Sequence, residues 1–549
     1  MAALINKTVK GNQYWYIVES KRINGKVKQE VIEYIGNTKK LYERMTCGDN
    51  RLPTENLTIK SYSHGDTYAL LKIADMLEVE KILDESFKPQ VRNGIKRSAS
   101  LILAAIQRVC DPRSKNEFKN WFETTSLPYR LGIKSQVLTS QHFWGQMDEI
   151  SSEELYKAED AITEKIINKY NVELDKIALD YTNYFTYINS GNEVSSLAKR
   201  GKNKQKRHDL KQCSLAVVTS KEMGLPLFSH VYEGNKNDST EFKEYISLLK
   251  ERMPDYNARE ITLVFDGGSV TKDNLKSLEV HYICSFSLSY CKELYEIDLF
   301  DYKEVEVAGR KVMAYRITKE IWGQARECVL TFSHLLYNGQ VRELNANVSK
   351  ALQELNDIND KIKNPKSRIK KDEKSIMQRA NSVLSKYKYI PEIVRFMVSE
   401  NKIFYETDTD IKKKIMHKYF GKKLMITDQK DWTTKEIIKT YREQDCIEEL
   451  FKDTKNTQHF SVQPIYHWTD QKIKVHIFIC LLGLTLTVVL QKELQNRGIN
   501  ISKNKLINEL CGIRESWIKD NKTTENQIIK KLEDMSDLQA KIWGLLEKI

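Results

Sequence analysis

The chain has 549 residues, which is too long for a single hydrophobic core and predicts about three or four domains. Its 88 Lys and Arg against 75 Asp and Glu give a formal net charge of +13. This excess favours a polyanionic partner, most simply nucleic acid, with a lysine-rich genome as the alternative explanation. Hydrophobic residues make up 40% of the chain, and only 9 prolines and 22 glycines are present, which argues against long disordered linkers.

The cysteines, the N-terminus and the apolar stretches indicate the cellular compartment of the protein. The nine cysteines are scattered and form no CxxC pair or zinc-type cluster, which favours reduced thiols in a cytosol. The N-terminus, MAALINKTVKGNQYW, lacks the basic-then-apolar pattern of a signal peptide. The longest apolar stretch, Ile477 to Leu490, has 14 residues and is short for a bilayer. We therefore expect a buried core helix there, no membrane partner and a cytoplasmic location.

The N-terminal region predicts strands followed by helices. Residues 14–35 resemble two strands around Asn24 and Gly25, because an Asn-Gly pair tolerates positive φ and is the strongest hairpin-turn signal. Residues 66–150 carry apolar side chains at three- and four-residue spacing, which predicts helices. These helices form either a DNA-binding domain or a plain bundle. Their basic residues include Lys96, Arg97, Arg108, Arg113, Lys115 and Lys119.

From about residue 174 the pattern changes to strands. LDKIALD is a short apolar strand that ends in Asp180, and ITLVFDGG is another that ends in Asp266. Between them CSLAVVTS and LPLFSHVY form two strands separated by a turn at 221–224, and HYICSFSLS follows as a fifth. Helical stretches such as TEFKEYISLLKERM lie among the strands, so the region has the alternation of an α/β domain.

Residues 299–425 have a different pattern. VEVAGRKVMAY and ECVLTFS are expected to form antiparallel strands, and a long charged helix with an apolar stripe follows. Pro365 interrupts this helix, and a second helix is expected to return. We interpret the segment as an insertion into the α/β domain rather than as part of its sheet. The stripe consists of Leu344, Val348, Leu352, Leu355, Ile358 and Ile362.

The C-terminal part returns to the α/β pattern and then becomes helical. GKKLMITD is a strand, DWTTKEIIKTYREQDCIEELFKDTK is a helix with Thr433 as its N-cap, and residues 500–549 are amphipathic and helical. The fold class is therefore multidomain α/β. The expected parts are an N-terminal β-hairpin region (1–60), a helical DNA-binding domain (61–165), the first part of the core (166–298), an insertion of strands then helices (299–420), the second part of the core (421–495) and a C-terminal helical region (496–549).

Two of the predicted strands end in a carboxylate, Asp180 and Asp266. Side chains at the carboxyl ends of sheet strands converge on one edge, where α/β proteins usually bind their ligands. An aspartate after three apolar residues is costly to bury unless it is paired or holds a metal. A turn or a helix N-cap is the alternative role for each of them taken singly.

A third carboxylate lies on the helix predicted at 441–455. Tyr441, Gln444, Glu448 and Lys455 are offset by 0, 3, 7 and 14 residues, and at 100° per residue they fall on one face. A carboxylate, a cation and an aromatic ring then point in the same direction. A solvated, salt-bridged face is the alternative interpretation.

This helix resembles the Y-x2-R-x3-E-x6-K signature of cut-and-paste DDE transposases from bacterial insertion sequences. Tyr441, Glu448 and Lys455 match in register, whereas Gln444 stands at the arginine position. The arginine's contact with the transposon end then falls to Gln444 or to its neighbour Arg442. Further similar segments are DYTNYF, LVFDGG, GLPLFSHVYEGNKNDSTEF, KRGKNKQKRHDLKQ, IYHWTDQKIKVHIFICLLGL and RVCDPRSK, so the resemblance spans nearly the whole chain.

The resemblance implies an RNase H-like catalytic core with a large insertion, in which Asp180, Asp266 and Glu448 bind two Mg²⁺ ions, with Mn²⁺ as a possible substitute. Asp180 would bridge both ions, Asp266 would hold one and Glu448 the other. Two such ions, about 3.5–4 Å apart, activate the attacking oxygen and stabilise the leaving one. The implied reactions are hydrolysis that frees a 3′-OH at the element end and attack of that hydroxyl on target DNA.

A basic loop follows Asp180 closely in the sequence. Residues 199–211 contain seven cations and a single acid, which predicts contacts with backbone phosphates near the active site, with a merely solvated loop as the alternative. The cations are Lys199, Arg200, Lys202, Lys204, Lys206, Arg207 and Lys211.

Two histidines and two tryptophans near the third carboxylate are expected to be structural. His467 and His476 have no metal-ligand spacing to another His or Cys, which favours core or helix-end positions. Trp432 and Trp468 are expected to pack in the core. Stacking on a flipped base is the alternative that the resemblance offers for these tryptophans.

The function implied is that of an insertion-sequence transposase. It would bind terminal inverted repeats of double-stranded DNA through the N-terminal hairpin and the helical region. A homodimer is expected on synapsis, with the C-terminal helices as candidate contacts. Two alternatives remain: a catalytically silent or repurposed DNA-binding protein of transposase origin, and an RNase H-like nuclease without strand transfer.

Overall fold

The computed structural model describes residues 2–23, 26–46, 57–203, 207–253, 260–520 and 528–549. The chain divides into two compact units. The smaller consists of Met1–Ser63 and Ile513–Asp534, and the larger of His64–Gly512 and Met535–Ile549. Each unit is described by itself below.

The smaller unit contains two antiparallel three-stranded sheets, of order β1-β2-β3 and β19-β18-β4. Strands β2 and β3 pair up to Ile23 and Lys26, as expected of a hairpin, although the turn residues Asn24 and Gly25 lie outside the described residues. The elements are β1 (Ala2–Val9), β2 (Asn12–Ile23), β3 (Lys26–Asn37), α1 (Thr38–Thr46), β4 (Leu57–Ser63), β18 (Arg514–Asp520) and β19 (Ile528–Leu532).

Strands β18 and β19 correct the expectation that residues 500–549 are entirely helical. Strand β18 pairs with β4 from Arg514 opposite Ser63 to Asp520 opposite Leu57. The buried Trp517 of β18 packs edge-on against Tyr62 of β4, with 5.7 Å between ring centroids. The segment therefore forms a strand in spite of its amphipathic pattern, because it can pair with the edge of β4, which is distant in the sequence. The flanking segments are helical, as α18 (Lys503–Cys511) and α19 (Asp537–Leu546).

In the larger unit, a helical layer precedes the sheet, as the sequence predicted. The long helix α17 (Asp470–Gln495) packs against α2, α4 and α8 and is buried along most of its length. The other elements of this layer are α2 (Gly65–Met76), α3 (Val79–Ser86), β5 (Val91–Arg92), β6 (Ile95–Lys96), α4 (Arg97–Cys110), α5 (Phe118–Glu123), α6 (Leu127–Leu131), α7 (Ser140–Met147) and α8 (Ser152–Tyr170).

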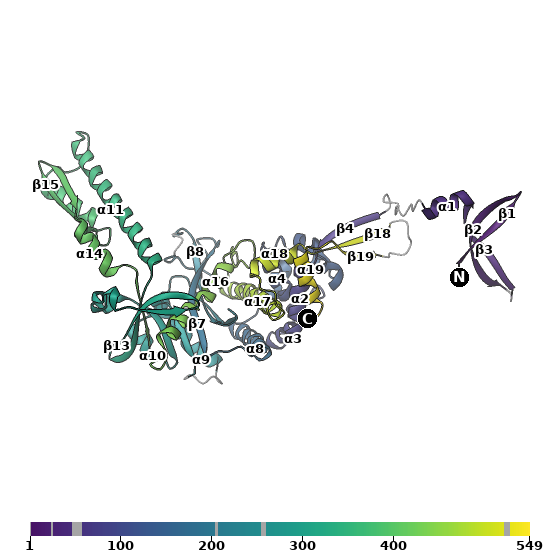
Figure 1. Ribbon diagram of the computed structural model, residues 1–549, viewed down its shortest axis with the longest axis horizontal. Coiled ribbons are helices and arrows are strands. Elements are labelled where there is room, and N and C mark those ends of the chain that lie inside the picture. The colour runs from purple at the N-terminus through teal and green to yellow at the C-terminus, as the bar shows by residue number, and fades with distance from the viewer. Residues whose placement is uncertain (1, 24–25, 47–56, 204–206, 254–259, 521–527) are drawn as a thin grey trace. The chain divides into compact units, whose positions relative to one another are not determined.

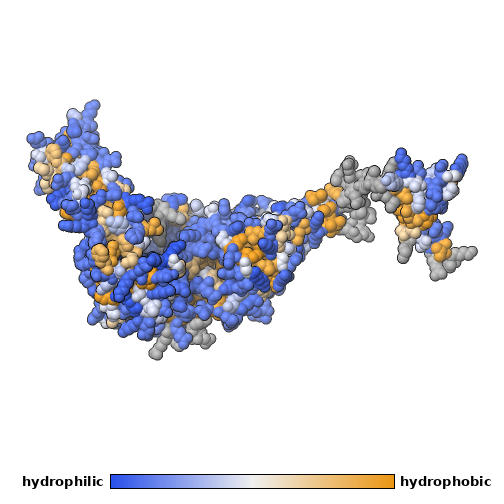
Figure 2. Space-filling model, viewed as in Figure 1, coloured by the Kyte–Doolittle hydropathy of each residue, from blue (hydrophilic) through white to orange (hydrophobic). Residues whose placement is uncertain are grey.

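Helix α17 extends beyond the 14 apolar residues noted in the sequence. Its 26 residues pass the length and composition test for a membrane span, and it is the one helix of the described residues that does. Because 94% of its most apolar window is buried inside the protein, it is a core helix, as expected. The face of the larger unit visible in Figure 2 is covered mainly by hydrophilic residues.

The larger unit contains a nine-stranded mixed sheet of order β12-β13-β14-β17-β11-β10-β7-β8-β9, and Figure 1 labels β7, β8 and β13 of it. Strands β7, β10 and β11 run parallel, and every other neighbouring pair is antiparallel. The strands are β7 (Lys176–Thr186), β8 (Lys211–Ser220), β9 (Pro226–Glu233), β10 (Thr262–Phe265), β11 (His281–Phe286), β12 (Lys303–Val307), β13 (Arg310–Ile321), β14 (Gln324–Phe332) and β17 (Lys422–Thr427).

Helices cover both faces of this sheet. On one face, Phe242 of α9 packs against Phe265 of β10. On the other, Ile437 and Ile438 of α15 join a core cluster with residues of β10, β11, β13, β14 and β17. The helices are α9 (Asp238–Arg252), α10 (Lys272–Ser277), α15 (Thr434–Arg442) and α16 (Asp445–Asp453).

Strands β12, β13 and β14 correct the expectation that the whole of residues 299–420 lies outside the sheet. Strand β14 pairs with β17 from Glu327 opposite Thr427 to Phe332 opposite Lys422. Cys328, Val329 and Leu330 are completely buried, which suits an interior strand. Because β14 and β17 lie far apart in the sequence, the apolar pattern alone did not show this pairing.

The chain leaves the sheet between β14 and β17 and builds a separate small core. Helix α11 (His334–Lys363) ends before Pro365, as predicted, and α12 (Glu373–Leu384) returns against it. The stripe on α11 is buried at Leu344, Leu355 and neighbouring positions in this core. Figure 1 shows α11 leading away from the sheet beside β15 and α14. The remaining elements are α13 (Ile390–Ile393), β15 (Val394–Ser399), β16 (Lys402–Thr407) and α14 (Thr409–Tyr419).

Close packing of α17 on α4 predicts a cost for the smallest enlargement of Gly483. A Cβ there would lie 2.6 Å from the carbonyl oxygen of Ala105 and 2.8 Å from Cγ2 of Val109. We expect Gly483→Ala to lower the free energy of unfolding by about 1–3 kcal/mol through overpacking. Gly339→Ala on α11 is the matched control, because no atom lies within 4 Å of its Cβ position, and it should gain up to about 1 kcal/mol. Urea unfolding measures both. A Gly483→Ala protein as stable as the parent would contradict the packing described.

Candidate active site

Asp180 lies within β7, not at its end. The strand continues to Thr186, and Asp180 stands opposite Val217 of β8. This corrects the expectation of a short strand ending at the carboxylate. The residues after Asp180 pair with the start of β8, so a polar position inside a continuing strand was mistaken for a terminus.

Asp266 immediately follows β10 and lies beside Asp180. Phe265, the last residue of β10, pairs in parallel register with Leu179 of β7, so the two aspartates occupy the next position on neighbouring strands. Successive side chains on a strand point to opposite faces. Because Phe265 packs against α9 on one face, Asp266 is directed to the opposite face, which α15 covers.

The face of β7 that carries Asp180 is the one covered by α16. Thr182 and Tyr184 follow Asp180 at two-residue spacing and share its face. The ammonium of Lys455 donates a hydrogen bond to Thr182 Oγ1, and the Tyr184 hydroxyl donates one to Thr454 Oγ1 at 2.7 Å. Both partners come from the end of α16, which packs on β7 and β8. Asp180 and Asp266 therefore face the same pair of helices.

The predicted single helix through residues 441–455 is two helices. Helix α15 begins at a capping box formed by Thr433 and Glu436, which confirms the predicted N-cap, and it ends at Arg442. Helix α16 begins at Asp445, with Gln444 at the junction, and Lys455 lies beyond its end. Gln444 keeps helical φ and ψ of −65° and −9°, so the break is a local tightening that nearly preserves the common face.

Tyr441 and Gln444 both contact Asp266. The Tyr441 hydroxyl donates a hydrogen bond to Asp266 Oδ1 at 2.9 Å, and the Gln444 side-chain amide donates to the same oxygen at 3.4 Å. Burial, together with the Asp266 charge, raises the pKa of Tyr441 well above its ordinary value, so the phenol stays protonated and remains a donor. The ammonium of Lys423, on β17, lies 4.5 Å from the centre of the Tyr441 ring.

Glu448 is exposed on α16, between buried residues that fix the helix on the sheet. No group of three His, Cys, Asp or Glu side chains is close enough to hold a metal within the described residues, so the three carboxylates are not drawn together. Asp266 and Glu448 form no ion pair with a described basic side chain, although Asp266 Oδ1 accepts the hydrogen bonds of Tyr441 and Gln444. Carboxylate oxygens are the donors that Mg²⁺ prefers, so the donor set fits this ion.

The basic loop is partly engaged by its own chain. Lys199, Arg200 and Lys202 are exposed. Arg207 forms a two-pronged ion pair with Asp209, at 2.8 and 2.9 Å, and Lys211 donates to the carbonyl oxygen of Asn192. The remaining two predicted cations, Lys204 and Lys206, lie outside the described residues.

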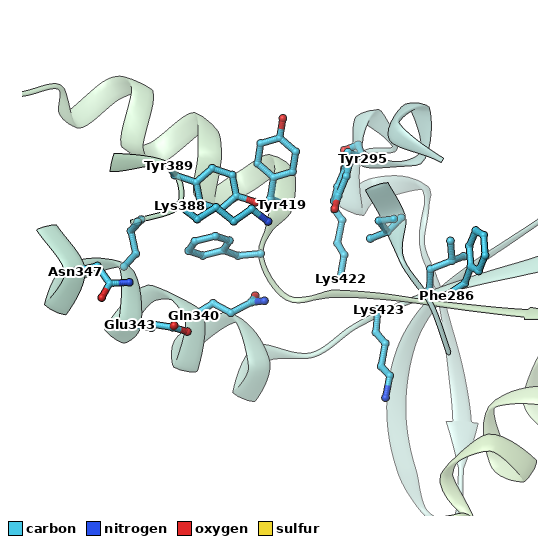
Figure 3. Close-up of a pocket in the computed structure, with 14 residues that line it drawn as sticks. Phe286, Tyr295, Gln340, Glu343, Asn347, Lys388, Tyr389, Tyr419, Lys422 and Lys423 are labelled. Carbon is cyan, nitrogen blue, oxygen red and sulfur yellow. Dashed lines mark hydrogen bonds between the residues drawn. The ribbon is translucent and has the colours of Figure 1, made fainter. Parts of the chain in front are cut away.

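A cavity of about 320 Å³ lies where α11 leaves the sheet and β17 begins (Figure 3). Lys422 donates to the carbonyl oxygens of Tyr295 and Ile297 there, at 2.9 Å each. The next residue, Lys423, is the one that lies over Tyr441. Sequence reasoning missed Lys423 because a lysine pair at the start of a strand gives no signal of an aromatic partner distant in the sequence.

The histidines behave as predicted, but one tryptophan does not. His467 and His476 are buried, and burial lowers the pKa of His467 to about 3, so the ring is neutral. Trp432 packs partly buried against the cluster beneath α15. Trp468 is 55% exposed, which corrects the expectation that it belongs to the core.

Two aspartates thus lie on neighbouring strands under helices that carry a tyrosine and a glutamate. A family model for the transposase DDE domain matches residues 189–486, more than half of the chain, and the chain belongs to the DDE transposase family. A second model, described as the N-terminal domain of IS1634 family transposases, matches residues 4–49. The protein is thus a DNA transposase of an insertion sequence. The larger match includes Asp266 and Glu448 and begins nine residues after Asp180.

Solved transposase complexes show a weaker likeness. One is piggyBac transposase in a synaptic complex with hairpin DNA, which is 9% identical to this chain. The match has a TM-score of 0.37 and covers 81% of this chain and 79% of that one. A pre-cleavage Mos1 transpososome shares 15% identity over 35% of this chain and 60% of that one, with a TM-score of 0.14. No curated protein matches the chain.

The Tyr441 hydrogen bond predicts a specific effect of Tyr441→Phe. Loss of a supporting partner typically costs a metal-binding carboxylate 10- to 100-fold in metal affinity or activity, and Asp266 is a candidate for that role. We expect DNA cleavage to need correspondingly more Mg²⁺, while the free energy of unfolding falls by no more than about 1 kcal/mol. Tyr245→Phe is the control, because Tyr245 loses one buried hydrogen bond, to Phe228, on the α9 side of the sheet. An unchanged Mg²⁺ dependence of cleavage in Tyr441→Phe would argue against this role.

Proposed function

We propose that Asp180, Asp266 and Glu448 together form the catalytic metal site of this transposase. The observation that carries the proposal is the pair of contacts on either side of Glu448. Gln444, one helical turn before Glu448, reaches Asp266, and Lys455, two turns after it, reaches the face of β7 that carries Asp180. Glu448 therefore lies along α16 between two points anchored to the aspartate-bearing strands.

The donors fit two Mg²⁺ ions, or Mn²⁺ in their place, which would polarise the scissile phosphate and lower the pKa of the attacking water. Asp180, Asp266 and Glu448 would hold these ions through their carboxylate oxygens. Tyr441 and Gln444 orient the carboxylate of Asp266. Lys455, Tyr441, Gln444 and the exposed Arg442 are candidate contacts to the DNA end.

The proposed reactions proceed in two steps at this site. In the first, water attacks a phosphodiester at the element end, and the bond to the 3′ oxygen breaks and leaves a 3′-OH. In the second, that hydroxyl attacks a phosphodiester of the target DNA, a new bond forms to phosphorus, and a target 3′ oxygen departs with the proton. Phosphodiester number is conserved in the second step, so the joining needs no separate energy source.

Strand order supports an RNase H-like core within the larger sheet. Five strands, β9-β8-β7-β10-β11, have the order 3-2-1-4-5 with β8 antiparallel, and β12, β13, β14 and β17 extend this unit at one edge. The inserted helices are candidates for contacts with DNA or a partner subunit. Because two ends must be joined, a homodimer on synapsis is part of the proposal, with α18 and α19 as candidate contacts and a cytoplasmic, nucleoid-associated location.

End-specific DNA joining tests the carboxylate assignment. Purified protein, Mg²⁺ and a labelled duplex carrying the element ends should give nicking and joining. Asp180→Asn and Glu448→Gln should lower both rates by roughly 10²-fold or more, because metal-assisted charge stabilisation is worth several kcal/mol.

Glu449→Gln is the matched control for Glu448, because Glu449 is the adjacent exposed carboxylate, 3.7 Å from Lys503, and it should keep the parental rates. Binding of the ends without cleavage by the parent protein would indicate a silent, transposase-derived binder. Cleavage that ignores the end sequence would indicate a nuclease without strand transfer. Equal rates for Glu448→Gln and Glu449→Gln would remove Glu448 from the site.

The exposed cations of the basic loop give a separate prediction for DNA affinity. Replacing Lys199, Arg200 and Lys202 by Gln should weaken binding for any DNA sequence and reduce the slope of log K against log salt by about 2 to 3, since each phosphate contact contributes about 0.9. The control removes three exposed lysines of α9 and α10, namely Lys243, Lys250 and Lys276. Fluorescence anisotropy at several salt concentrations measures both, and equal slopes for the two triple variants would refute phosphate contacts by the loop.

A further inference from the structure

A second cavity, of about 390 Å³, lies where α17 begins. Its walls come from the end of α4 and the segment after it, from α7, and from residues 464–468 before α17. The RVCDPRSK segment noted in the sequence, from Arg108 to Lys115, supplies much of the wall. This segment has no role in the carboxylate site described above.

The charges around the cavity are unbalanced. Arg108, Arg113, Lys115 and Lys472 line it, and no Asp or Glu stands among the described lining residues. Arg113 and Lys472 are each compensated outside the cavity, Arg113 by Asp111 and Lys472 by Asp148, both at 2.9 Å. The two buried cations, Arg108 and Lys115, have no such carboxylate in the described part of the chain, and they are 2% and 8% exposed.

Arg108 and Lys115 differ in how they are held. Arg108 donates to the carbonyl oxygens of Arg113, Ser461 and Gln463, which fixes two chain segments against each other. Its Nε still has no hydrogen-bond partner. The side chain of Lys115 forms no hydrogen bond or ion pair with the described residues, and its ammonium lies 5.7 Å from the centre of the Phe143 ring.

A buried ammonium beside a guanidinium is costly unless an anion accompanies it. Burial and the charge of Arg108 lower the pKa of Lys115 to about 8, so it is still mostly charged at neutral pH. The neighbouring His467 and His476 are kept neutral by burial, because the pKa of each is lowered. Nothing in the described cavity therefore supplies the missing negative charge.

We infer that this cavity is an anion site that takes a phosphate of the DNA backbone, held by Lys115 and the free Nε side of Arg108. Helices α7 and α17 both begin at its wall, where Ser140 and Lys472 lie in their first turns, and helix N-termini attract anions. Exposed aromatic rings surround the opening and suit a sugar or base beside the phosphate. They belong to Trp144, Tyr466 and Trp468, which are 42%, 57% and 55% exposed.

The cavity is connected to the carboxylate-bearing strand. Ile465, between the lining residues Pro464 and Tyr466, forms a parallel bridge with Thr186, the last residue of β7, and its carbonyl oxygen accepts a hydrogen bond from the Tyr187 amide at 2.8 Å. Asp180 lies six residues before Thr186, which is about 20 Å along an extended strand. Duplex DNA covers that distance in about six base pairs. The phosphate site would thus hold the DNA about half a turn from the cleaved bond, and this placement rests on the proposed function.

Lys115→Met tests the site, because it removes the charge and keeps a chain of similar length. We expect weaker binding of DNA that carries the element end, and a slope of log K against log salt that is smaller by about 1. We also expect an equal or higher melting temperature, because a buried unpaired charge is lost. A merely structural lysine would give the opposite pattern, with lower stability and an unchanged slope. Lys250→Met is the control, since Lys250 is an exposed lysine of α9 paired with Glu279 at 2.8 Å.

A neutral methylphosphonate scanned through the end DNA locates the phosphate. In the parent protein, one substitution near six base pairs from the cleaved bond should weaken binding, and in Lys115→Met the same substitution should cause no further loss. Equal losses in both proteins at every position, or a parental salt slope for Lys115→Met, would overturn the inference. If the parent binds and joins ends normally in that case, only the phosphate site fails. If the parent does not bind the ends, the proposed function fails instead.

Discussion

The parallel pairing of β7 with β10 is the constraint on which the rest of this enzyme depends. It sets Leu179 beside Phe265, and so places Asp180 and Asp266 side by side on one face of the sheet. A shift of one residue would turn either carboxylate towards α9 and the opposite core. The completely buried Leu179, Val264 and Phe265 hold this register, so apolar packing fixes a polar site.

The helices above the sheet bring further side chains to Asp266 and to β7. Tyr441 is buried in the core under α15, yet its hydroxyl reaches Asp266, so one side chain links helix packing to carboxylate orientation. The tightened junction at Gln444 lets α15 pack on β11, β12 and β14 while α16 packs on β7 and β8. Lys455 then fixes the far end of α16 to β7. Each motif residue thus contacts the sheet or, like Glu448, lies between two that do.

The sequence predicted what depends on local pattern and missed what depends on distant pairing. The capping box at Thr433 and the end of α11 before Pro365 were visible, because both follow from a few neighbouring residues. Strand β14 was predicted as a strand but placed outside the central sheet, and β18 was predicted as helix, because their partners β17 and β4 lie far away in the sequence. Asp180 was recognised as important but placed at a strand end, since a polar residue within a strand resembles a boundary. The grouping of Asp180, Asp266 and Glu448 into one metal site is the proposal made above.

The apolar packing of α17 explains why a charged cavity can exist at the start of this helix within a well-packed fold. Apolar contacts of α17 with α4 and α8 stabilise that region. Arg108 can therefore donate its hydrogen bonds to backbone carbonyl oxygens, and the Lys115 side chain can stay without an ion pair. Natural proteins tolerate such local destabilisation where a ligand supplies the missing partner. Since Ile465 links the cavity wall to the end of β7, a phosphate bound there would position DNA against the same strand that carries Asp180. Substrate anchoring and catalysis would then share one rigid element, which keeps the DNA in a fixed position relative to the carboxylates.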